Sequence, residues 1–83
     1  MEFVITKHVA DLSEKTKGGW VKQINFVKWG NNKEKLEIRL WHYPEGENTP
    51  DRAGRGITLT KEEYDALCKI PNIFETIDMI ASD

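Results

Sequence analysis

The sequence predicts an α+β fold in which a four-stranded, curved antiparallel sheet is followed by a C-terminal helix, in the order β-β-β-β-α. Two observations predict it. Four segments rich in β-branched or aromatic residues come first, and one segment with a capping signal and helical spacing of apolar residues comes last. The 83 residues have room for a single domain, which we place at residues 1–83. A domain of this size has a small core, so a homodimer is expected.

The first three predicted strands are separated by polar or turn-forming residues. Residues 2–12 are rich in Val, Ile and Phe and precede the polar stretch 13–19. Residues 20–29 and 35–43 alternate between two faces, and the Gly-Asn-Asn sequence at 30–32 accepts the positive φ of a turn. The second and third strands should therefore form a hairpin.

The alternation in the third strand is the clearest in the chain and predicts which side of the sheet is buried. Its aliphatic side chains, from Leu36 to Leu40, share one face, which we assign to the core. The other face then carries Arg39, Trp41 and Tyr43, where burial within one protomer does not explain the aromatic rings. We therefore expect an open sheet face that is aromatic, amide-bearing and basic, with Trp29 on the neighbouring strand.

A polar loop at residues 44–54 leads to a short strand at 55–60 and then to a helix. Thr60 and Glu63 have the spacing of a capping box at the helix start. Pro71 lacks a backbone donor, so the helix should kink or break into two pieces there. The apolar side chains that follow at helical spacing must be shielded from water, and we expect the helix of a partner protomer to pack against them. The predicted dimer interface consists of Ile70, Ile73, Phe74, Ile77 and Ile80.

Charge is unevenly distributed along a chain whose formal net charge is -2. Residues 1–43 contain eight Lys or Arg against five Asp or Glu, whereas residues 44–83 contain four against nine. A nearly neutral total can therefore coexist with one positive surface that suits a polyanion. Because the predicted helix is acidic, such a ligand should lie on the sheet and not on the helix.

Several classes of protein are not expected. Cys68 is the only cysteine and has no Cys or His at zinc-ligand spacing, so neither a disulfide nor a metal site is predicted. His8 and His42 lie on separate strands with no catalytic grouping around them, so we predict no enzyme and no cofactor. The apolar runs are too short to cross a bilayer and no export signal is present. We therefore expect no membrane contact and a cytoplasmic protein, nucleoid-associated in a bacterial cell.

The segment from residue 36 to residue 60 contains an ordered group of motifs. The third strand runs into WHYPEGE at residues 41–47, GRGI at residues 54–57 opens the last strand, and Thr60 caps the helix. In this combination the chain resembles the positive-cofactor-four family of single-stranded-DNA-binding transcriptional coactivators, and most of all its short bacterial YdbC-type members. The resemblance covers residues 20–80.

The resemblance implies a homodimer paired through its helices, whose two curved sheets form a concave surface that holds single strands. It also implies that Trp29 and Trp41 stack on bases and that Arg39 contacts phosphate. The chain lacks the Ser-rich, basic N-terminal tail of eukaryotic members, and it has Val27 where they have a basic residue. Lys28, one position later, would need a bulge to reach the binding face.

We predict that the protein binds single-stranded DNA, with RNA as a further ligand, with little sequence preference, and that it acts in transcription regulation, replication or repair. Such binding needs flat rings for the bases and positive charge for the phosphates. The alternative is a protein–protein interaction module that uses the aromatic sheet face, with Trp29 and Trp41 as interface residues. The predicted nucleic-acid-binding residues are Lys22, Asn25, Lys28, Trp29, Lys33, Lys35, Arg39, Trp41, Tyr43, Arg52 and Arg55.

Overall fold

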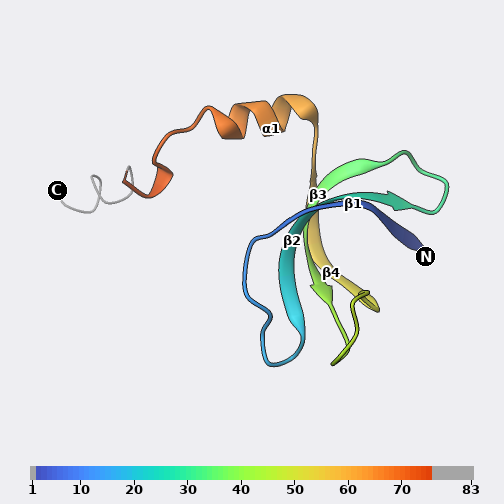
Figure 1. The fold of residues 1–83 in the computed structure, drawn as a ribbon. Helices are drawn as coiled ribbons and strands as arrows, with labels where there is room; N and C mark the ends of the chain where they lie inside the picture. Colours follow the sequence, from blue (N-terminus) through green and yellow to red (C-terminus); the bar gives the residue numbers. More distant parts are fainter. Residues whose placement is uncertain (1, 76–83) are drawn as a thin grey trace.

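The computed structural model describes residues 2–75 and contains one four-stranded sheet and one helix (Figure 1). The strands are β1 (Phe3–Asp11), β2 (Trp20–Trp29), β3 (Lys35–His42) and β4 (Arg52–Leu59), and the helix is α1 (Lys61–Cys68). Neighbours in the chain are neighbours in the sheet, in the order β1-β2-β3-β4, and every pair is antiparallel. The predicted β-β-β-β-α order is confirmed. The last strand begins at Arg52, inside the segment that the sequence assigned to a loop.

Irregular pairing curves the sheet. The register of β1 against β2 shifts between Ile5 and Lys7 and again between His8 and Ala10. The register of β3 against β4 shifts between Arg39 and Trp41. Such bulges bend a strand and increase its twist, and Figure 1 shows the sheet curling around a concave side. The edge strand β1 therefore bends over this side of the sheet.

The buried core lies on the concave side of the sheet, which corrects the assignment made from the strand pattern. Val27 exposes none of its surface and Trp41 exposes 1%, because the Phe3 ring from β1 packs against Trp41 with centroids 4.8 Å apart. The aliphatic side chains of β3 from Leu36 to Leu40 lie on the convex side and are only partly buried. The alternation of side chains defines the two faces of the sheet, but the bulges determine which face lies on its concave side. The expectation that Trp41 lies open is therefore wrong.

The helix begins as its capping signal predicts. The Thr60 hydroxyl accepts a hydrogen bond from the Glu63 backbone N–H at 3.0 Å, and the Glu63 carboxylate accepts one from the Thr60 N–H at 2.8 Å. Helical backbone stops at Cys68 and resumes at residues 73–75, which confirms the predicted break around Pro71. None of the helices in the described part of the chain has the length and apolar character that crossing a membrane requires.

The helix extends away from the sheet and buries no side chain of its own (Figure 1). Its apolar residues stay exposed, among them Leu67 at 44% and, beyond its end, Phe74 at 80%. The radius of gyration is 15.5 Å, against about 12 Å for a compact chain of this length. Ile70, Ile73 and Phe74 of the predicted dimer interface are thus exposed, and Ile77 and Ile80 lie outside the described residues.

Candidate functional site

The concave surface is built from alternate residues of β2 and β3. Antiparallel pairing places Asn25 opposite Glu37 and Gln23 opposite Arg39, so that each pair points to the same side of the sheet. Asn25 is completely buried, and Gln23 exposes 5% of its surface. Polar side chains that are buried this deeply need hydrogen-bond partners, and every buried side-chain N or O atom in the described residues has one. The concave surface is therefore a set of fixed polar groups around an aromatic cluster.

Three aromatic rings form that cluster. Trp29 and Trp41 are nearly parallel, with ring centroids 6.2 Å apart and planes 12° from each other. Phe3 packs against both, at 5.6 Å from Trp29 and 4.8 Å from Trp41. Trp29 remains partly exposed, whereas Trp41 is buried. The Trp29 ring is therefore partly accessible to a ligand base, and the Trp41 ring lies beside it with a nearly parallel plane.

Glu37 fixes the exposed edge of this cluster. Its carboxylate exposes 2% of its surface and accepts hydrogen bonds from Trp29 Nε1 at 2.6 Å and from Arg39 Nε at 2.7 Å. The Arg39 guanidinium also donates from Nη1 to the Gly54 carbonyl oxygen at 2.9 Å and lies 5.0 Å from the Trp29 ring centroid. Because a buried carboxylate is stable only when it is paired, these contacts hold the Trp29 and Arg39 side chains in one arrangement.

A glycine in β4 makes room for this arrangement. A Cβ at Gly56 would lie 2.7 Å from the Cβ of Arg39 and 2.7 Å from the Ile38 carbonyl oxygen. Both distances are shorter than side chains tolerate, and the second contact is to backbone that cannot move aside. The GRGI motif therefore has a steric role in the sheet: it lets β4 pass close to the Arg39 side chain.

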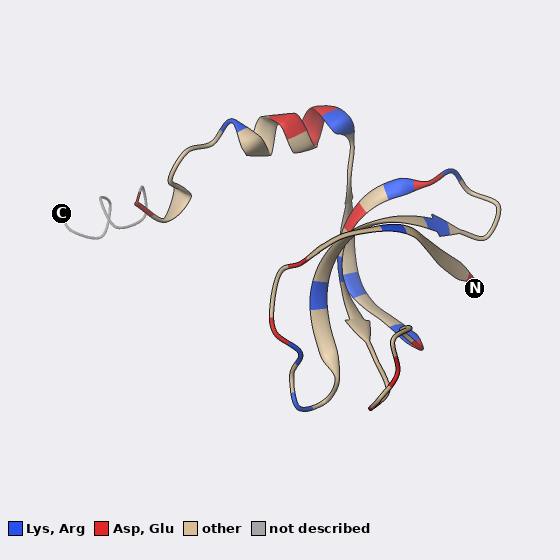
Figure 2. Ribbon diagram, viewed as in Figure 1, with Lys and Arg blue, Asp and Glu red and all other residues tan. Residues whose placement is uncertain are grey.

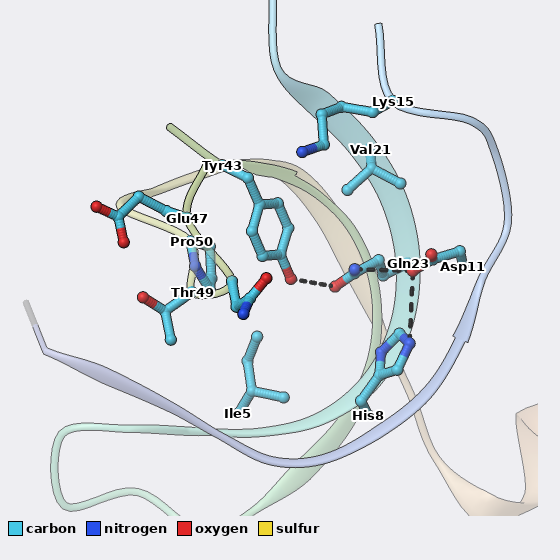
Figure 3. Close-up of a pocket in the computed structure, with 11 residues that line it drawn as sticks. Ile5, His8, Asp11, Lys15, Val21, Gln23, Tyr43, Glu47, Thr49 and Pro50 are labelled. Carbon is cyan, nitrogen blue, oxygen red and sulfur yellow. Dashed lines mark hydrogen bonds and ion pairs between the residues drawn. The ribbon is translucent and has the colours of Figure 1, made fainter. Parts of the chain in front are cut away.

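A second polar group lies near the other end of the concave surface (Figure 3). Gln23 Nε2 donates to Asp11 Oδ1 at 2.8 Å, and Gln23 Oε1 accepts from Asn25 Nδ2 at 2.9 Å and from the Tyr43 hydroxyl at 3.2 Å. His8 Nδ1 lies 2.7 Å from Asn25 Oδ1. Four of these five side chains, all except Asn25, border a cavity of about 500 Å³ under the 44–50 loop; they come from β1, β2 and the residue that follows β3. Of the five, only Asn25 and Tyr43 belong to the predicted binding set.

The basic residues of the predicted set divide between the two sides of the sheet. Lys33 and Lys35 border a shallow hollow together with Trp29 and Arg39, so they lie beside the partly exposed indole. Lys22 pairs with Leu40 and follows the alternation to the convex side. Lys28 does the same, because the register of β2 is regular between Val27 and Trp29 and no bulge redirects it.

The two arginines near β4 have different surroundings. Arg52 places its guanidinium 5.5 Å from the ring centroid of Trp20, which alternates to the convex side with Lys22. Arg55 is exposed on β4. The acidic side chains of α1 gather near its start, away from the concave surface (Figure 2). The cations that border the hollow beside Trp29 are therefore Lys33, Lys35 and the paired Arg39.

Sequence reasoning missed Glu37, Gln23, Asp11 and His8 as members of these groups. Glu37 and Gln23 do carry a signal, because each is a polar residue on the strand face that also holds a tryptophan. Asp11 and His8 approach the others only through the bulged pairing of β1, which the strand pattern does not reveal. Within residues 2–75, no group of three or more His, Cys, Asp or Glu side chains is arranged to hold a metal ion.

Comparison with known protein families places the chain. A family model described as Transcriptional Coactivator p15 (PC4) matches residues 16–70, which is more than half of the chain and includes β2, β3, β4 and α1. No curated protein matches the chain. The match is to the family as a whole, so the likeness to the short bacterial YdbC-type members stays a prediction.

Proposed function

The chain belongs to the Transcriptional Coactivator p15 (PC4) family, and from that membership we propose that it is a homodimer that binds single-stranded DNA with little sequence preference and acts in transcription regulation, replication or repair. The observation that carries the proposal is the partly exposed Trp29 indole, which donates to the Glu37 carboxylate at 2.6 Å and lies beside Lys33 and Lys35. A fixed flat ring with cations next to it suits unpaired bases and their phosphates. RNA offers the same two features and is a further ligand.

Support for the dimer comes from apolar surface that one protomer leaves uncovered. A groove of about 700 Å³ lies on the convex side, between the sheet and the start of α1. Its apolar lining comes from Val9, Ile24, Phe26, Leu36, Leu59 and Tyr64. A second copy packed against this face would remove both the groove and the exposed apolar residues after α1 from water.

The test is fluorescence anisotropy with a labelled oligothymidine of about 20 nucleotides, compared with a duplex of equal length at several salt concentrations. We expect tight binding of the single strand only, with a log-log salt slope of about -0.7 per neutralised phosphate. Absence of binding at low salt would refute the proposal and favour the alternative, in which the aromatic surface docks a protein.

A further inference from the structure

The cavity beside Tyr43 has the size and the walls of a small-ligand site. Its volume of about 500 Å³ falls within the range of roughly 300 to 1,000 Å³ that is typical of such sites. Ile5, Val21 and Pro50 supply apolar walls, and the polar side chains of Asp11, Gln23 and Tyr43 converge on one side (Figure 3). We call this cavity the Tyr43 pocket.

The hydrogen bonds along the polar side have a fixed direction. The Asp11 carboxylate can only accept, so the Gln23 side chain turns its Nε2 toward Asp11 and its Oε1 toward Asn25. Asn25 then donates through Nδ2 and presents Oδ1 to His8, so His8 Nδ1 is the donor. Neither amide can flip without placing two acceptors or two donors face to face. The polar side of the pocket is therefore preorganised before a ligand arrives.

The groups left over for a ligand are mainly acceptors. Asp11 Oδ1 accepts from Gln23 Nε2 and also lies 3.4 Å from His8 Nε2, which leaves Oδ2 for a ligand. The Tyr43 hydroxyl donates its proton to Gln23 and keeps its lone pairs. Glu47 adds a second carboxylate at the border, whereas Lys15 is the one Lys or Arg of the lining and lies 5.6 Å from the Tyr43 ring centroid. Two carboxylates against one ammonium disfavour a phosphate in this pocket. They favour a flat ring that presents N–H groups.

Among the DNA bases, guanine has the edge that fits such a site. Its Watson–Crick edge presents N1–H and N2–H side by side, which a carboxylate can accept together, and O6 beside them accepts from a cation such as Lys15. Adenine and cytosine present an unprotonated ring nitrogen next to their amine, which would face the carboxylate with its lone pair. Thymine has one N–H between two carbonyl oxygens. We propose that the Tyr43 pocket binds one guanine base of the bound strand, with Asp11 as its acceptor.

This inference rests on the proposed single-strand binding and adds one base-selective position to a surface that is otherwise sequence-tolerant. The test compares four labelled 20-nucleotide strands by anisotropy: oligothymidine alone, and the same strand with a central guanine, hypoxanthine or adenine. Hypoxanthine differs from guanine only in lacking the N2 amine. We expect guanine to strengthen binding about tenfold and hypoxanthine or adenine to give little gain.

Protein variants test whether the guanine preference arises in the Tyr43 pocket. Asp11→Asn should abolish the guanine preference, and an unchanged circular dichroism spectrum should show that the variant is folded. Glu14→Gln, an exposed acidic residue that does not line the pocket, is the matched control and should keep the preference. Equal affinity for all four strands would overturn the inference while the proposed function stands. Loss of binding to every strand would overturn both.

Discussion

Glu37 and Arg39 form a nearly buried ion pair on the surface where DNA is proposed to bind. The two atoms, Glu37 Oε1 and Arg39 Nε, lie 2.7 Å apart, and their side chains expose 2% and 18% of their surfaces. The arginine charge is therefore already balanced within the protein. Its remaining role is to hold the Trp29 ring, 5.0 Å from its guanidinium, and not to supply net charge to the surface.

This pairing predicts different salt behaviour for two neighbouring cations. Replacing both partners, Glu37→Gln together with Arg39→Gln, leaves no buried carboxylate unpaired; it should weaken single-strand binding but leave the log-log salt slope almost unchanged, because the neutral pair neutralises no phosphate. Lys35→Gln should reduce the magnitude of the slope by about 0.7, the share of one phosphate contact, because Lys35 is exposed and no acidic side chain within residues 2–75 forms an ion pair with it. Anisotropy titrations at four or more salt concentrations measure both slopes. If the double variant lost as much slope as the Lys35 variant, Arg39 would be a phosphate ligand after all.

The two tryptophans should respond differently to truncation. Trp41→Ala removes a ring that exposes 1% of its surface, and we expect it to cost about 3 to 5 kcal/mol of stability. Trp29→Ala should instead weaken single-strand binding by about 1 to 3 kcal/mol, with a smaller effect on folding, because its ring is partly exposed. Urea denaturation and anisotropy, measured on both variants, separate the two effects. A stable Trp41 variant would mean that the ring is not part of the core.

Local sequence signals predicted the order of the elements, the bounds of β2 and the cap of α1, because alternation and the Thr60–Glu63 spacing depend on residues close in the chain. The side of the sheet that forms the core could not be predicted in this way. It depends on the bulges in β1 and β4 and on Phe3, which packs over Trp41 from a strand that is distant in sequence. The same bulges assemble the Tyr43 pocket, so only part of the site was visible in the sequence.

Acidification should loosen the loop at residues 44–50. His42 Nδ1 lies 2.5 Å from Asp51 Oδ1, and this hydrogen bond holds the pKa of Asp51 below its ordinary value of 3.8. A carboxyl whose pKa is lower in the folded state stabilises the fold above its unfolded pKa, and the effect is lost as the pH falls through the folded value. The backbone amides of the loop should therefore exchange their hydrogens faster below about pH 4.

Hydrogen exchange of the Asp51 backbone N–H, which donates to the His42 carbonyl oxygen, reports this loosening. Asp51→Asn should show weak protection at neutral pH already and little further change on acidification. Glu14→Gln, at an exposed position in another loop, should behave as the unmodified protein. Equal acid sensitivity of the Asp51 variant and the unmodified protein would assign the effect to other carboxyl groups.

Phe74 provides a direct test of the proposed dimer. Its ring exposes 80% of its surface in the protomer, so replacement by aspartate removes no internal packing and should leave the circular dichroism of the sheet unchanged. If a second copy covers this ring, Phe74→Asp introduces a charge into an apolar interface and should shift the mass measured by light scattering from dimer to monomer. Glu75→Gln, one residue further along the same helical segment, should remain dimeric. A Phe74 variant with the mass of a dimer would place the interface elsewhere. The convex groove beside Tyr64 would then be the surface to mutate next.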